Sequence, residues 1–174
     1  MFNGQWPSNY RTTIFLNANM DELAINLNLR RVYEGVFEQD PPDTLLDLDI
    51  YFNNEKIHEF DKSLDQSKFY KKITNFPEDK CCILQFVMNN KTHEHTKVDN
   101  KGNIIGDCRI EISNLTFDNV VLGQILVDNA VYLHSKNINT AQVEKTKFYG
   151  EMGCNGTVEL KFYTPIYLWL LEHM

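Results

Sequence analysis

The fold is decided by a stretch that runs Leu23-Ala24-Ile25-Asn26-Leu27-Asn28-Leu29-Arg30, where every second residue is aliphatic. A second stretch, Leu46-Asp47-Leu48-Asp49-Ile50-Tyr51-Phe52, repeats this alternation. Because successive side chains of a β-strand point to opposite faces, period 2 places one set in a core and the other toward water. Half-buried strands of this kind are typical of antiparallel sheets.

Further strands are expected where β-branched and aromatic residues gather between turn clusters. The candidate ranges are 12–16, 81–88, 109–112, 130–134, 143–149 and 157–163. Asn100-Lys101-Gly102 fits a hairpin turn with a glycine bulge, which pairs residues 92–98 with 103–112. With about eight to ten strands, the sequence predicts an all-β fold, an antiparallel β-sandwich of the jelly-roll or carbohydrate-binding-module type.

Helix is expected in two short segments at most. Residues 61–70 fit a short surface helix or a turn. Residues 165–172 fit a C-terminal helix with Thr164 as N-cap and Pro165 at its first position, and fit equally an edge strand that continues 157–163.

Length and composition describe one folded domain over residues 1–174. The chain has 43% hydrophobic and 12% aromatic residues, which excludes an intrinsically disordered protein. Its 17 basic and 24 acidic residues give a net charge of −7, which lacks the electrostatic footprint of nucleic-acid binding. Nucleic acid is therefore not expected as a partner.

No targeting or membrane-spanning segment is visible in the sequence. The first residues, Met1 to Pro7, lack the basic and apolar regions of a secretory signal. The apolar run Ile166 to Leu171 is far shorter than the ~18 residues that a spanning helix needs. We expect synthesis in a cytoplasm and no membrane insertion.

The four cysteines do not form a recognisable disulfide or zinc framework. Cys81 and Cys82 are adjacent, and Cys108 and Cys154 stand alone. On a strand, the two adjacent side chains point to opposite faces, so we expect buried, reduced thiols rather than disulfides.

Two groups of residues suggest metal sites. On a strand, His93 and His95 would share a face and could bridge a transition metal, but no further ligand lies at short spacing, so a hydrated polar strand face before a turn is the favoured interpretation. Carboxylates and amides in the loops suggest calcium, with Asp99, Asn100, Asp107 and Asp118 as candidate ligands. The competing interpretation is that Asp and Asn simply make turns. No other cofactor is expected.

Catalytic signatures are weak, and we do not expect an enzyme. Asp47 and Asp49 share a strand face at a separation that suits paired carboxylates in glycoside hydrolysis. Keeping the outer face of that strand hydrated is the simpler role. The sequence contains no nucleophile elbow, phosphate loop or dinucleotide fingerprint.

Aromatic residues suggest either sugar recognition or packing. Flat rings stack on sugars, and the candidates are Trp6, Tyr10 and Tyr51. The C-terminal run is apolar enough to dock into the core or against another subunit, so the candidate interface residues are Trp6, Tyr167, Trp169 and Leu170.

Three further stretches are distinctive: Trp6-Pro7-Ser8-Asn9-Tyr10-Arg11-Thr12-Thr13-Ile14-Phe15-Leu16, Thr92-His93-Glu94-His95-Thr96-Lys97-Val98-Asp99-Asn100-Lys101-Gly102-Asn103-Ile104-Ile105, and Gly153-Cys154-Asn155-Gly156-Thr157 leading into Thr164-Pro165-Ile166-Tyr167-Leu168-Trp169-Leu170-Leu171-Glu172. Together they resemble small β-rich proteins of marine T4-like phages, including cyanophages, with a form like carbohydrate-binding-module sandwiches. That group has no established activity, so no functional residue transfers. The resemblance implies a virion or host-surface role.

Two functions follow as hypotheses. The first is a non-enzymatic, virion-associated structural protein that works by association with itself or with other virion proteins. The second is a carbohydrate-binding module for a host-surface glycan, with calcium as an optional aid.

Overall fold

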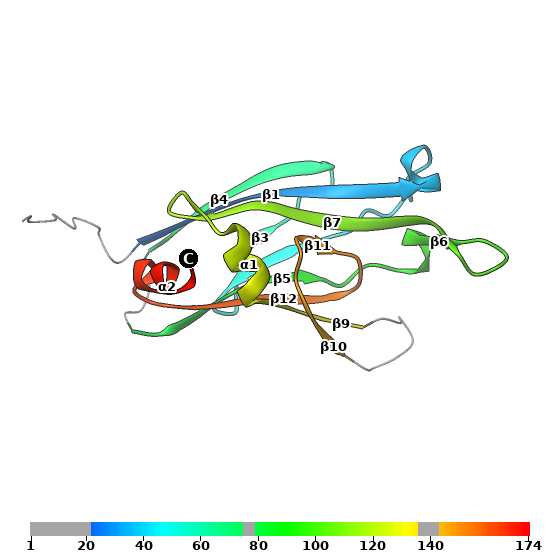
Figure 1. The fold of residues 1–174 in the computed structure, drawn as a ribbon. Helices are drawn as coiled ribbons and strands as arrows, with labels where there is room; N and C mark the ends of the chain where they lie inside the picture. Colours follow the sequence, from blue (N-terminus) through cyan, green and yellow to red (C-terminus); the bar gives the residue numbers. More distant parts are fainter. Residues whose placement is uncertain (1–21, 75–78, 136–142) are drawn as a thin grey trace, which may run out of the picture.

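Two antiparallel β-sheets of six strands each form the protein in the computed structural model, which describes residues 22–74, 79–135 and 143–174. The sheets lie face to face in Figure 1, with two short helices at one side of the space between them. This arrangement confirms the predicted all-β sandwich.

The first sheet is built around its two longest strands, β1 (Glu22–Gly35) and β7 (Ile104–Phe117), which pair antiparallel along most of their length. The strand β4 (Gln66–Thr74) pairs with the other edge of β1. Three short strands share the remaining edge of β7, namely β6 (Thr96–Val98), β11 (Glu151–Met152) and β8 (Val120–Val121). The β7 strand therefore reaches from one end of the sandwich to the other (Figure 1).

The second sheet has the order β10-β9-β12-β5-β2-β3. Its strands are β10 (Glu144–Lys147), β9 (Ala130–His134), β12 (Gly156–Tyr163), β5 (Cys81–Met88), β2 (Asp49–Phe52) and β3 (Glu55–Glu59). At its centre, β5 and β12 pair over eight residues, and each alternates buried and half-buried or exposed side chains.

Most predicted strands are confirmed, and two match the expected ends: residues 81–88 form β5 and residues 130–134 form β9. Residues 109–112 and 157–163 lie inside β7 and β12. Of residues 46–52, only 49–52 form a strand, and residues 12–16 lie outside the described residues. The described residues form twelve strands, more than expected, because β3, β4, β8 and β11 were not predicted. Of these, β8 and β11 have two residues each, too few to show a period.

The helical alternative for residues 61–70 was wrong. The Asp61 carboxylate accepts hydrogen bonds from the backbone N–H and the hydroxyl of Ser63, at 2.8 and 2.7 Å, which makes a turn. The chain then enters β4 at Gln66. The strand was hard to predict because Phe69 is its only buried residue.

The described residues form four short helical segments, three between strands and one after the last strand. They are η1 (Val36–Glu38), η2 (His93–His95), α1 (Gly123–Asn129) and α2 (Ile166–His173). The C-terminal segment is thus a helix, but Thr164 does not cap it. Its hydroxyl instead accepts a hydrogen bond from the backbone N–H of Lys80 at 3.0 Å, and Pro165, after a cis peptide bond, is the N-cap.

The two sheets and α2 meet at Phe162 of β12. Its ring lies 4.8 Å from the ring of Phe117 on the opposite sheet, measured between centroids. On the other sides it lies 6.2 Å from Phe52 and 5.9 Å from Trp169 of α2. Phe162 and Phe117 are fully buried, so this aromatic cluster joins both layers to the helix.

The two adjacent cysteines point to opposite faces, as the strand alternation predicts, but the expected burial holds only for Cys82 and Cys108, since Cys81 is exposed and Cys154 is half-buried. Cys81 is exposed and Cys82 is buried, on opposite faces of β5, and all four cysteines are free. Burial raises the pKa of Cys82, and it raises that of Cys108 to about 11 against a smaller opposing effect of Lys91. The two buried thiols are therefore protonated and unreactive at neutral pH.

Replacing Phe162 with alanine should remove about 3–5 kcal/mol from the free energy of unfolding, because it opens a cavity between three layers. Urea denaturation measures this change. The matched control is Tyr163→Ala, next to it but 59% exposed, which should cost less than about 1 kcal/mol. Equal losses in the two variants would contradict the central role of Phe162.

Candidate functional site

The C-terminal helix α2 is apolar on both its faces but is buried on only one. Ile166, Trp169 and Leu170 are buried in the core, whereas Leu168 is 58% and Leu171 is 71% exposed. A helix that is hydrophobic all round is normally buried all round. The exposed face of α2 is therefore the best candidate for a functional surface.

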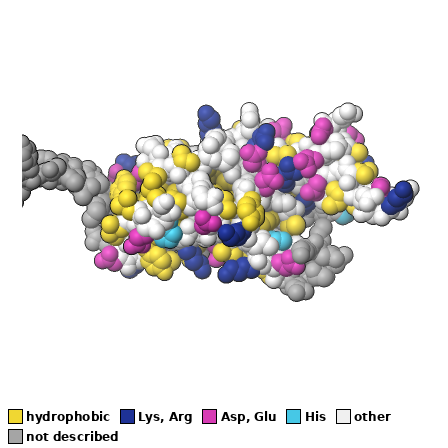
Figure 2. All heavy atoms as spheres, viewed as in Figure 1, with side chains coloured by type: hydrophobic (Ala, Val, Ile, Leu, Met, Phe, Trp, Pro, Cys, Tyr) yellow, Lys and Arg dark blue, Asp and Glu magenta, His cyan; other side chains and the backbone are white. Residues whose placement is uncertain are grey.

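This face consists of Tyr167, Leu168, Leu171 and Met174, which we call the C-terminal apolar patch. Positions 167, 171 and 174 follow helical spacing, so their side chains lie along one side of α2. All four are exposed, Met174 by 86%. Figure 2 shows hydrophobic side chains gathered at the end of the molecule where α2 lies.

Contacts from both sheets fix the orientation of the patch. The Trp169 ring packs between Phe162, at 5.9 Å, and His173, at 4.7 Å. The Tyr167 hydroxyl donates a hydrogen bond to Oδ2 of Asp118 at 3.2 Å, at the turn after β7. Burial raises the pKa of Tyr167, and the neighbouring Asp118 carboxylate adds to this. Trp169 therefore fixes the buried side of the helix, and the hydrogen bond of Tyr167 fixes its exposed side.

In this orientation of α2, some of the predicted interface residues are buried and one is exposed. Trp169 and Leu170 are buried within their own molecule, so neither is available on the surface. Tyr167 lies in the patch, and Trp6 lies outside the described residues. Sequence reasoning missed Leu168 and Leu171, although helical spacing within 166–171 would have separated an inner from an outer face.

The four predicted calcium ligands do not come together. Asp99 closes the β6–β7 turn by accepting hydrogen bonds from the backbone N–H groups of Lys101 and Asn103, at 2.8 and 2.9 Å, and Asn100 is exposed at the same tip. Asp107 binds the Lys91 ammonium group at 2.7 Å. Asp118 follows the opposite end of β7, 11 residues beyond Asp107, which is about 37 Å along the strand at about 3.4 Å per residue.

Asp118 has a structural role instead. Its Oδ1 accepts a hydrogen bond from the backbone N–H of Ala24 at 2.7 Å, while Oδ2 holds Tyr167. Within the described ranges, no group of three or more His, Cys, Asp or Glu side chains is placed to hold a metal ion.

The strand placement of the two neighbouring histidines was wrong, because residues 93–95 form the 3-10 helix η2. His95 is buried, and its Nδ1 accepts a hydrogen bond from the backbone N–H of Thr92 at 3.0 Å. Its Nε2 lies 2.8 Å from the carbonyl oxygen of Thr44 and donates to it. His93 is exposed, so the two rings do not share a face.

Tyr51 lies in a polar row on the outer face of the second sheet. Its strand neighbour is Gln85, whose side chain donates to Glu159 on β12 at 3.0 Å. The Tyr51 hydroxyl lies 3.4 Å from Asp49. Trp6 and Tyr10 lie outside the described residues.

The two carboxylates considered for hydrolysis are each paired with a lysine. Asp49 lies 2.8 Å from the Lys56 ammonium group, and Asp47 lies 3.2 Å from that of Lys62. The Asp49 pair fits a hydrated outer strand surface, whereas Asp47 precedes β2 and its Oδ1 is buried without a hydrogen-bond partner among the described residues.

Comparison with models of protein families, with curated proteins and with solved structures finds no match for this chain. Among the described helices, none is long and apolar enough to cross a membrane.

The variant Asp118→Ala should lower the free energy of unfolding by about 1–3 kcal/mol, because the backbone N–H of Ala24 loses its acceptor. Urea denaturation of both proteins, with and without millimolar calcium, checks this prediction. We expect calcium to shift neither curve. A calcium-dependent rise in stability that disappears in the variant would instead make Asp118 a ligand.

Proposed function

We propose that this protein is a non-enzymatic structural β-sandwich that works by protein–protein association, with the C-terminal apolar patch as its contact surface. The observation that carries the proposal is the exposure of Leu168 and Leu171 on a helix whose other face is packed in the core. Burying such side chains against a partner gains about 25 cal/mol for each Å² of apolar surface removed from water.

The first sheet offers a contrast that favours this surface. Its outer face carries ion pairs between neighbouring strands, including Arg30 with Glu111 and Arg109 with Glu151. Those charges are compensated within the molecule and need no partner. The apolar side chains of the patch have no such partners within the molecule. Water solvates them poorly, so contact with a partner would be favourable.

The partner that we propose is a second copy of the chain or another protein of the same particle. The resemblance to proteins of marine T4-like phages supports a virion as the setting, after synthesis in the host cytoplasm. The proposal of association itself rests on the patch and does not depend on this setting.

The double variant Leu168→Glu/Leu171→Glu should abolish self-association, because it places two charges in the contact surface. Light scattering after size exclusion, at micromolar concentrations, measures the mass of both proteins. Both positions are exposed, so the fold should survive.

A matched control keeps the number of added charges but moves them away from the patch. The variant Tyr70→Glu/Tyr149→Glu changes two side chains that are 63% and 73% exposed, and it should associate like the original protein. If the unmodified protein is a monomer throughout the concentration range, self-association through the patch is refuted.

A carbohydrate-binding module is the second candidate, and the row of Tyr51, Gln85 and Glu159 favours it. An aromatic ring beside amide and carboxylate groups is the usual chemistry of sugar recognition. The three residues lie on neighbouring strands of the second sheet, so a rigid scaffold holds them in line.

Glycan-array binding tests this second candidate. If a glycan binds to the row of Tyr51, Gln85 and Glu159, the variant Tyr51→Ala should bind it at least about tenfold more weakly. The substitution removes the aromatic ring that would stack on the sugar. The control Tyr70→Ala, on the outer face of the other sheet, should bind normally. Measurements with and without a chelator show whether calcium takes part, and absence of binding to any glycan counts against the module.

A further inference from the structure

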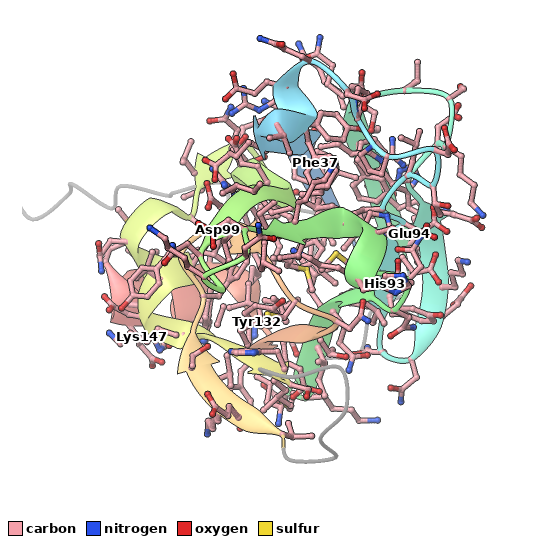
Figure 3. The ribbon with its side chains drawn as sticks, turned by 90° about the vertical axis from the view of Figure 1, so that its right-hand side faces the viewer. Phe37, His93, Glu94, Asp99, Tyr132 and Lys147 are labelled. Carbon is pink, nitrogen blue, oxygen red and sulfur yellow. The ribbon has the colours of Figure 1, made fainter. Side chains whose placement is uncertain are left out.

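A groove of about 500 Å³ lies at the end of the sandwich opposite α2, beside the β6–β7 hairpin. One wall is η1 and the loop that follows it to Asp43, and the other is η2 with the start of β6. Figure 3 looks onto this end of the molecule and labels Phe37 on the first wall and His93 and Glu94 on the second.

Two glycines allow the first wall to lie close against the hairpin. At Gly35 the chain leaves β1 with a φ of 61°, and an added Cβ would lie 2.0 Å from the carbonyl oxygen of Ile105. At Gly106, an added Cβ would lie 2.7 Å from the side chain of Val36. Only glycine allows these close approaches, so the position of η1 is fixed.

A buried histidine ties the two walls together. His95 of η2 donates from Nε2 to the carbonyl oxygen of Thr44, which follows directly after the first wall, at 2.8 Å. The Thr92 hydroxyl caps η2 by accepting from the backbone N–H of Glu94 at 3.3 Å. The groove is therefore preformed rather than a gap between two loose loops.

The carboxylates around the groove are uncompensated. Asp40, Asp43 and Glu94 are exposed and have no ion-pair partner in the part of the chain that the structure describes. Elsewhere the protein pairs its strand carboxylates with lysine or arginine, as at Asp49 and Glu111. Lys97 and His93 are the basic residues that line the groove, so its charge is negative overall.

Exposed aliphatic side chains lie on the hairpin whose first strand, at Thr96 and Lys97, lines the groove. Val98 and Ile104 are cross-strand partners and are 55% and 65% exposed. Val36, which also lines the groove, is 40% exposed. The hairpin projects from the end of the sandwich in Figure 1, and the hydrogen bonds of Asp99 keep its turn in one conformation.

We infer that this groove binds an extended, cationic polypeptide segment of a partner protein, with lysine or arginine side chains over Asp40, Asp43 and Glu94 and an apolar side chain against Val98 and Ile104. The three carboxylates belong to separate positions along both walls and form no metal cluster, so a string of cations fits them better than one ion. Complementary charge steers the segment, and the aliphatic rim holds it.

Fluorescence anisotropy with a labelled peptide of alternating lysine and leucine tests the inference. We expect saturable binding that weakens with salt, and no binding of the same peptide with glutamate in place of lysine. The triple variant Asp40→Asn/Asp43→Asn/Glu94→Gln should weaken binding at least tenfold, and Ile104→Ser should weaken it without any change of charge. Circular dichroism confirms that each variant is folded.

The control is a second triple variant with the same change in net charge at other exposed carboxylates, Glu55→Gln/Asp79→Asn/Glu172→Gln. It should bind the peptide like the original protein. Equal weakening by both triple variants would show only general attraction to a protein of net charge −7 and would overturn the inference, as would the absence of saturable binding. Because α2 lies at the opposite end, the association variants test a separate surface.

Discussion

The contact between Phe117, Phe162 and Trp169 is the interaction on which the rest of the structure depends. The rings of Phe117 and Phe162, 4.8 Å apart, join one sheet to the other. The indole of Trp169 in α2 packs against Phe162 at the same place. With Trp169 fixed inward, the helical period leaves Leu168 and Leu171 outward. The candidate association surface is thus a consequence of how the core closes, because one short helix cannot bury two apolar faces against one sandwich.

Buried polar groups position the loops at the other end. The Arg31 guanidinium lies 4.0 Å from the Phe60 ring and donates to the carbonyl oxygens of Leu46 and Asp61, at 2.7 and 3.1 Å. Burial lowers its pKa, and nearby carboxylates oppose that effect. The Lys91 ammonium group similarly binds Asp107 and the carbonyls of Cys108 and Gly153. These contacts stabilise the strand connections near the groove through hydrogen bonds rather than apolar packing, although Nη2 of Arg31 is buried without a partner among the described residues.

A sequence pattern records which face of one strand is buried, but it does not record which strands lie side by side. This difference explains which predictions were right and which were wrong. Alternation located β1, β5, β9 and β12 because burial of one face imprints a period on the chain. The calcium candidates failed to converge because Asp99 and Asp118 lie beyond opposite ends of one 14-residue strand, a separation that depends on where β7 begins and ends. The groove was not predicted, since its walls come from residues 36–43 and 93–97, which only the tertiary fold brings together.

The sequence by itself determined an all-β sandwich, the position of most strands and the opposite placement of Cys81 and Cys82, since each depends on period 2 within one strand. Only the tertiary structure decided that the C-terminal run is a helix, that Trp169 faces inward while Leu171 faces outward, and that uncompensated carboxylates surround a groove at the far end. Those features depend on contacts between residues distant in sequence, above all Phe117 with Phe162 and Thr44 with His95, and such contacts leave no period in the chain.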